Sequence, residues 1–118
     1  MAAKDELGAR GEQLATDHLT RAGLDILDRN WRCSQGELDI VARERDELVF
    51  VEVKTRSSVL FGHPFESITA IKLARLRRLA AAWCDEHPGS GSTVRIDAIA
   101  VIVPSHGAVE IEQLKRIS

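Results

Sequence analysis

Residues 36–56 read GELDIVARERDELVFVEVKTR, and this stretch decides the fold. It predicts two strands joined by a short charged turn, the first about Glu37 to Arg43 and the second about Glu47 to Lys54. The second strand is rich in β-branched and aromatic residues, as buried strands are. A charge inside a buried strand is costly unless it is paired or binds a metal. The charged residues within these apolar runs are therefore the first candidates for function: Asp39, Glu52 and Lys54.

The register of this hairpin predicts a pair of carboxylates. Side chains alternate along a strand, so Glu52 and Lys54 share one face, and Glu37 and Asp39 share another. If the hairpin turns at Arg45-Asp46, Asp39 lies opposite Glu52 and Glu37 opposite Lys54, with opposed Cβ atoms about 4.5–5.5 Å apart. Two carboxylates this close can bind one cation, and they resist joint ionisation unless a cation or Lys54 offsets them. A shift of one residue would move Asp39 to the other face.

Composition predicts one soluble domain over residues 1–118, with 44% hydrophobic and 29% charged residues. The net charge of -2 gives no overall attraction to nucleic acid, so such binding would need local clusters of Lys and Arg. The first residues lack the apolar core of a signal peptide, and no run approaches the ~18 apolar residues of a membrane span. We therefore expect a cytoplasmic protein with no membrane partner. Cys33 and Cys84 are expected to be buried free thiols, with a disulfide between them as the alternative.

The rest of the chain predicts two helices and three further strands. The expected helices are 5–22 and 66–86, and the expected strands are 24–30, 93–103 and 109–114. The order is therefore αβββαββ, an α/β (α+β) fold with a mixed five-stranded β-sheet flanked by helices.

Two helical residues are candidates whose role the pattern leaves open. Glu12 lies at the edge of an apolar stripe that includes Gly11 and Ala15, two small residues that would let the helix approach the sheet closely. A Glu on a helix is usually solvated. Lys72 borders the stripe of the second helix, with Arg75 on its opposite side. This basic run fits a solvated face and also a patch that faces phosphates.

The segments resemble a known superfamily of enzymes. Asp39 followed by Glu52-Val53-Lys54 resembles the core motif of the PD-(D/E)XK nuclease superfamily, which has the restriction-endonuclease-like fold. GARGEQLA, NWRC, GELDIVA, LVFVEVKTR, FG-x-P and RIDAIAV together are similar to a small uncharacterised bacterial family of YraN-type proteins. The likeness covers roughly Leu7 to Val103. Gly36-Glu37 precedes Asp39 where the superfamily often has Pro-Asp, so only the Asp of that element carries over.

This resemblance implies a site and an activity. By analogy with the related archaeal Holliday-junction resolvases, Glu12, Asp39, Glu52 and Lys54 would line one catalytic site. Mg²⁺ or Mn²⁺ would be bound by Asp39, Glu52, the carbonyl of Val53 and Glu12. The flanking phosphates of a nucleic acid would contact Arg56, Lys72 and Arg75. The implied protein is a metal-dependent endonuclease that hydrolyses phosphodiester bonds in DNA, selective for structure such as branched or single-stranded DNA, in repair, recombination or processing.

Two other interpretations stay open. In one, Glu52 and Lys54 form a salt bridge within a polar network and Asp39 is hydrogen-bonded nearby, with no catalysis. In the other, the chain is a nucleic-acid-binding or adaptor protein that retains the nuclease fold without turnover. The sequence also leaves open DNA against RNA, a homodimer formed through 109–114 or the first helix, and a protein partner that delivers substrate.

Overall fold

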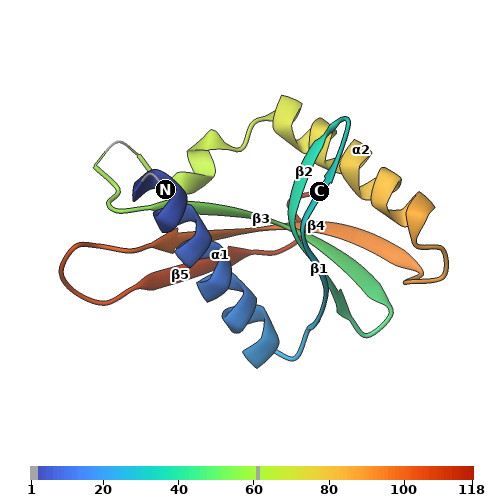
Figure 1. Cartoon of the computed structure of the whole chain (residues 1–118), viewed down its shortest axis with the longest axis horizontal. Coiled ribbons are helices and arrows are strands. Elements are labelled where there is room, and N and C mark those ends of the chain that lie inside the picture. The colour runs from blue at the N-terminus through green and yellow to red at the C-terminus, as the bar shows by residue number, and fades with distance from the viewer. Residues whose placement is uncertain (1–2, 61) are drawn as a thin grey trace.

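The five strands form one open sheet in the order β1-β2-β3-β4-β5 (Figure 1). The structure is a computed structural model that describes residues 3–60 and 62–118. Along the chain the elements are α1 (Ala3–Arg21), β1 (Asp25–Cys33), β2 (Gly36–Glu44), β3 (Glu47–Arg56), the 3-10 helix η1 (Pro64–Ser67), α2 (Ala70–Glu86), β4 (Thr93–Ile102) and β5 (Glu110–Leu114). The predicted order of helices and strands and the mixed sheet are confirmed.

The central strands β3 and β4 are parallel, and every other neighbouring pair is antiparallel. Parallel neighbours need a long crossover, and η1 with α2 supplies it. The second helix was expected to begin near Glu66, but that segment belongs to η1. The α-helix begins only after Thr69, whose side chain accepts a hydrogen bond from the Lys72 backbone N–H and so caps it.

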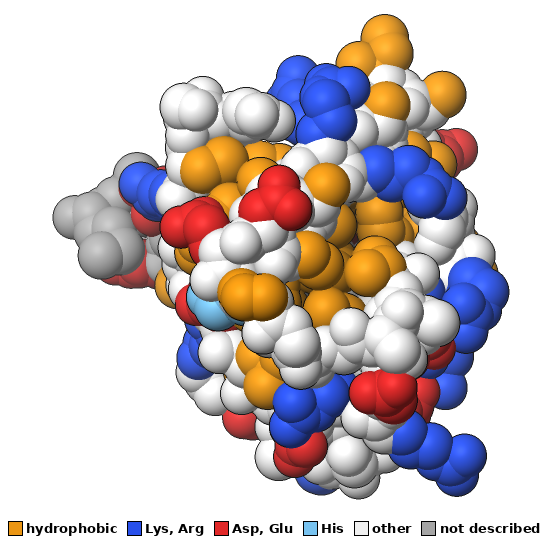
Figure 2. Space-filling model, turned by 90° about the vertical axis from the view of Figure 1, so that its right-hand side faces the viewer, with side chains coloured by type: hydrophobic (Ala, Val, Ile, Leu, Met, Phe, Trp, Pro, Cys, Tyr) orange, Lys and Arg blue, Asp and Glu red, His pale blue; other side chains and the backbone are white. Residues whose placement is uncertain are grey.

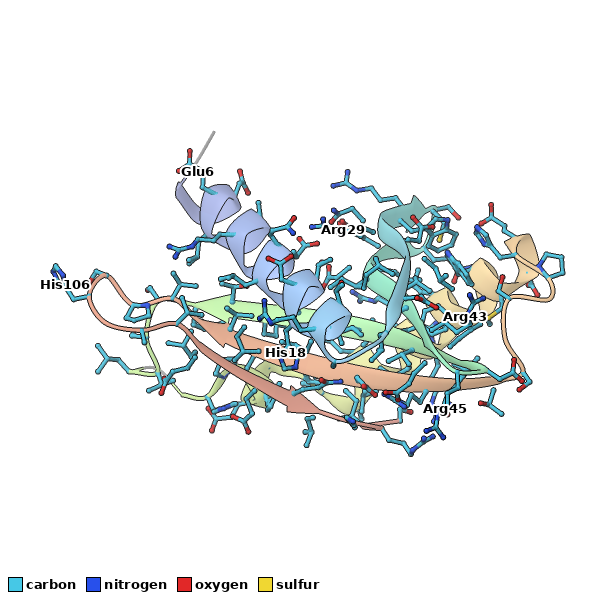
Figure 3. All side chains as sticks on the ribbon, turned by 90° about the horizontal axis from the view of Figure 1, so that it is seen from below. Glu6, His18, Arg29, Arg43, Arg45 and His106 are labelled. Atoms are coloured by element: carbon cyan, nitrogen blue, oxygen red, sulfur yellow. The ribbon has the colours of Figure 1, made fainter. Side chains whose placement is uncertain are left out.

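Each face of the sheet has its own core, because α1 packs on one face and α2 on the other (Figures 1 and 3). The core on the α1 side is built from Ala15, Leu19, Leu24, Ile40, Ala42, Val49, Val51, Ile99, Val101 and Val103. The core on the α2 side is built from Leu38, Val41, Leu48, Phe50, Leu76, Leu79, Ala80, Trp83 and Ile96. The strands that carry the candidate charges are thus covered on both faces.

Arg95 and Asp97 form a buried ion pair on β4, 5% and 0% exposed, with Arg95 Nε 3.0 Å from Asp97 Oδ1. The two residues pair along one strand, and Arg95 also reaches Glu44 and Glu47 across the sheet. Hydrogen-bond partners surround both buried charges, which indicates a structural role for the network.

An apolar surface lies at the end of the molecule seen in Figure 2, where apolar side chains gather with Lys and Arg around them. A shallow groove between α2 and β4 is lined by Ala81, Cys84 and Val94, among others. Cys33 and Cys84 are both free thiols, and they are half-buried rather than buried as expected. No helix among the described residues combines the length and the apolar character needed to cross a membrane.

Helix α1 lies unusually close to β3 because residue 11 is a glycine. A Cβ on Gly11 would overlap with the side chain of Thr55. Gly8, one turn earlier, has open space where its Cβ would be. The close approach at Gly11 also brings the next residue, Glu12, to the end of β3 that carries Glu52 and Lys54.

We expect Gly11→Ala to destabilise the protein and Gly8→Ala to stabilise it. The first substitution overpacks the contact with Thr55, at a cost of about 1–3 kcal/mol. The second adds no contact and gains about 0.5–1 kcal/mol of helix propensity. Chemical denaturation of the two variants measures both values. Equal effects at the two glycines would contradict the close contact between α1 and β3.

Candidate functional site

The site lies where β2 separates from β3. The ladder between these strands runs from the Glu44–Glu47 pair to the Ile40–Val51 pair. This is the predicted register, and its continuation places Asp39 opposite Glu52. From there toward Gly36, β2 is paired with β1. The two strands therefore form a fork, with Asp39 at its branch point.

Strand β2 turns over at Asp39. Leu38 belongs to the core on the α2 side, whereas Ile40 belongs to the core on the α1 side. Residues two apart in a strand ordinarily share a face, so the strand twists sharply between them. The sequence placed Glu37 opposite Lys54, which is wrong, because the twist carries this end of β2 away from β3. Glu37 faces Arg32 of β1 instead.

The carboxylate of Asp39 bridges the fork. Its Oδ2 accepts a hydrogen bond from the Val53 backbone N–H at 2.8 Å. A side chain thus takes a position that a backbone carbonyl of β2 would occupy in a continued ladder. Because the N–H and C=O of a strand residue point to the same edge, the Val53 carbonyl faces the same opening as Asp39.

Asp39 and Glu52 are in contact through their carboxyl groups, within hydrogen-bonding reach. Burial of Asp39, then its contact with Glu52, raises its pKa from 3.8 to about 9, and Glu12 adds a smaller repulsion. The hydrogen bond from the Val53 N–H lowers the pKa of Asp39, but by less than burial and Glu52 raise it. The arrangement therefore concentrates more negative charge than a metal-free protein readily accommodates.

Glu12 approaches this pair from the α1 side. It is half-buried, and its pKa is raised first by burial and then by the neighbouring carboxylates of Glu37 and Glu52, against an opposing effect of Arg29. The structure thus brings together the three predicted carboxylates, Glu12, Asp39 and Glu52, from a helix and two strands.

The cationic side of the site comes from β3 and α2. The side chains of Lys54 and Lys72 meet, and this contact, more than burial, lowers the pKa of Lys72. Glu52 and Arg56 are close enough to change that pKa as well, Glu52 raising it and Arg56 lowering it. Arg75 is exposed on α2, three residues after Lys72.

The donor atoms fit a hard divalent cation. Two carboxylates and a backbone carbonyl are oxygen ligands, which favour Mg²⁺ or Mn²⁺ over zinc. Burial, and then the neighbouring Glu52 carboxyl group, raise the pKa of Asp39, and a bound cation would oppose both effects. Within the residues described, no three His, Cys, Asp or Glu side chains converge into a complete metal-binding group. The fit therefore depends on the Asp39–Glu52 pair and the Val53 carbonyl.

Residues 11–101, which span the whole site, match the family described as "Uncharacterised protein family UPF0102". The chain belongs to this family. UPF0102 proteins of Beutenbergia cavernae and of an Arthrobacter species are 55% and 51% identical over 117 residues, covering 99% of each chain. A UPF0102 protein of Frankia casuarinae is 50% identical over 115 residues and covers 98% of each chain. The expected membership of a small bacterial family is confirmed.

Two residues of the UPF0102 chain that border the site were not predicted as part of it, Asn30 and Glu37. With its nitrogen toward the carboxylates, the Asn30 amide donates to Glu12 Oε1 at 2.7 Å and to Glu37 Oε1 at 3.2 Å. Both carboxylates line a shallow groove between α1 and β1. The signal that could have found Asn30 is its type, because Asn is depleted within strands.

The metal-free protein is expected to lose stability as pH rises from about 4 to about 9. The folded state binds the Asp39 proton more tightly than the unfolded chain does, because its pKa is raised from 3.8 to about 9. The free energy of unfolding contributed by the Asp39 proton is fully present below the pKa of Asp39 in the unfolded chain. It is lost as the pH rises through the higher pKa of Asp39 in the folded protein. Asp39→Asn imitates the protonated acid and should flatten this dependence. Denaturation midpoints in EDTA across this range test it, and parallel curves for the two proteins would contradict it.

Proposed function

We propose that this UPF0102 protein is a Mg²⁺- or Mn²⁺-dependent endonuclease of the PD-(D/E)XK type that hydrolyses phosphodiester bonds in DNA. The observation that carries the proposal is the contact between the Asp39 and Glu52 carboxyl groups beside the Lys54–Lys72 pair. Oxygen ligands and ammonium groups at one fork of a mixed sheet are the parts that phosphodiester hydrolysis requires. The five-stranded sheet with a helix on each face supports the restriction-endonuclease-like type.

In this proposal the carboxylates hold the cation. Asp39 and Glu52 would be ligands, the Val53 carbonyl a third, and Glu12 a further carboxylate from α1. A bound Mg²⁺ or Mn²⁺ would polarise the scissile phosphate and lower the pKa of a coordinated water. The bond from the Val53 N–H fixes Asp39 and leaves its second oxygen for this role.

Lys54 and Lys72 would act on the phosphate itself. Their ammonium groups lie beside Glu52, so a phosphate bound at the carboxylates would meet both. Lys54 would orient the attacking water and offset charge on the phosphorus, and Lys72 would neutralise a neighbouring oxygen. Arg56 and Arg75 would contact flanking phosphates. Phosphate contacts carry no sequence information, which supports selection of DNA by structure.

Purified protein with Mg²⁺ or Mn²⁺ should cleave at least one member of a labelled DNA panel of single strand, duplex, flap and four-way junction. Glu52→Gln removes the charge of a ligand, and we expect a loss of at least about 100-fold in rate. Glu86→Gln changes an exposed carboxylate at the end of α2 and should keep the wild-type rate.

Two outcomes would count against this function. Equal cleavage by the wild type and Glu52→Gln would identify a contaminating nuclease. Binding of the DNA without cleavage would favour a nucleic-acid-binding or adaptor protein that retains the fold. An RNA panel of the same shapes, run in parallel, separates DNA from RNA as the substrate.

Arg56→Gln should weaken DNA binding and reduce its dependence on salt. Each phosphate contact that is lost lowers the slope of log K against log [salt] by about one. Arg45→Gln, in the turn between β2 and β3 at the other end of β3, should leave the slope unchanged. Fluorescence anisotropy with Ca²⁺ in place of Mg²⁺ measures the slope, and equal slopes for the two variants would remove Arg56 from the interface.

A further inference from the structure

Asn30 has a backbone conformation that is unusual inside a strand. Its φ is 52°, in the left-handed region, although it lies within β1. Arg29 is paired with Ile40 and Trp31 with Leu38, so Asn30 is level with Asp39. The irregular residue of β1 therefore lies beside the twist of β2. Asn tolerates this conformation better than most residues, and such outliers often mark functional positions.

The side chain of Asn30 joins three elements. Its amide nitrogen donates to Glu12 of α1 at 2.7 Å and to Glu37 of β2 at 3.2 Å. These two carboxylates repel each other, and an amide with two N–H groups can satisfy both. The contact restricts Glu12, which is otherwise a long side chain on a helix surface, to a position that is still close enough to Glu52 for the two carboxylates to repel each other.

Neighbouring contacts hold the same part of β1 against α1. Arg29 Nη1 donates to Gln13 Oε1 at 3.0 Å, directly after Glu12 in the helix. Figure 3 shows Arg29 on the part of the molecule where β1 faces α1. Arg32 Nε lies 3.5 Å from Glu37 Oε2 and holds that carboxylate from the other side. Asn30 is thus the centre of a set of contacts that ends on the Glu12 carboxylate.

We propose that Asn30 is a positioning residue that holds the Glu12 carboxylate beside the Asp39–Glu52 cation site, an inference that rests on the function proposed above. Its amide acts through Glu12 and does not contact the cation or the DNA. Loss of the amide releases Glu12 toward solvent and leaves the Asp39–Glu52 pair in place. The cation then binds more weakly, and the phosphate contacts of Lys54 and Lys72 remain.

The experiment compares Asn30→Gly with Arg45→Gly. Glycine adopts a positive φ without strain, so the first variant removes the amide and keeps the backbone. Arg45 has the same kind of backbone, with φ 57°, in the turn between β2 and β3, and it is the matched control. Asn30→Asp is the second variant, since it keeps the shape but adds a third negative charge. Circular dichroism and denaturation establish that each variant is folded.

The first measurement is the Mn²⁺ dissociation constant from calorimetric titration. Residues that orient a metal ligand affect affinity by about 10- to 100-fold. We expect Asn30→Gly to weaken Mn²⁺ binding by at least about tenfold, Asn30→Asp, which also lacks the amide donor, to bind Mn²⁺ more weakly than the wild type, and Arg45→Gly to have no effect. In cleavage assays at fixed Mn²⁺, kcat should fall for Asn30→Gly while KM for DNA stays near the wild-type value.

A double-mutant cycle with Glu12→Gln identifies the route of the effect. If Asn30 acts through Glu12, Asn30→Gly should change Mn²⁺ binding little in the Glu12→Gln background. An effect of equal size in both backgrounds overturns the inference, as does wild-type Mn²⁺ affinity in Asn30→Gly; in either case the proposed function stands if the wild type cleaves. A wild-type protein that neither binds Mn²⁺ nor cleaves overturns the function and this inference together.

Discussion

The hydrogen bond from the Val53 N–H to the Asp39 carboxylate is the interaction on which the site depends. It spans the point where β2 separates from β3. It also fixes the Asp39 carboxylate beside Glu52, although the two carboxylates repel each other. The two cores on either side of the sheet supply the packing that holds this unfavourable contact. The fold thus gathers the acidic groups Asp39 and Glu52 at the fork between β2 and β3. The ammonium groups of Lys54 and Lys72 lie next to them.

The register of the central hairpin could be predicted because it depends on residues that are close in the sequence. Alternation of side chains and the charged turn at Arg45-Asp46 gave the register, and the structure has that register from Glu44–Glu47 to Ile40–Val51. Alternation failed at Asp39, because it assumes a strand without a sharp twist. Glu37 was assigned to the wrong neighbour for this reason, and only long-range packing of Leu38 against the α2 core reveals the turn.

Residues outside the hairpin were harder to place from sequence. The helical pattern alone left Glu12 as a solvated residue, and only the family resemblance assigned it to the site. Its position depends on the contact between Gly11 and Thr55, which are far apart in the sequence. Asn30 was missed because its role depends on a bridge between α1 and β2 that no periodicity encodes. Lys72 was predicted at the border of the apolar stripe of the second helix, and its half-buried position and its contact with Lys54 agree with that.

The division of the site among layers has an evolutionary consequence. Glu12 comes from α1, Lys72 from α2, and the carboxyl pair from the sheet between them, and each helix packs on its own core. Substitutions in the α2 core can therefore shift Lys72 without disturbing Glu12, and those in the α1 core can do the reverse. Within the family, the position of the carboxylate from α1 and that of the ammonium group from α2 can therefore change separately, because each depends on a different core.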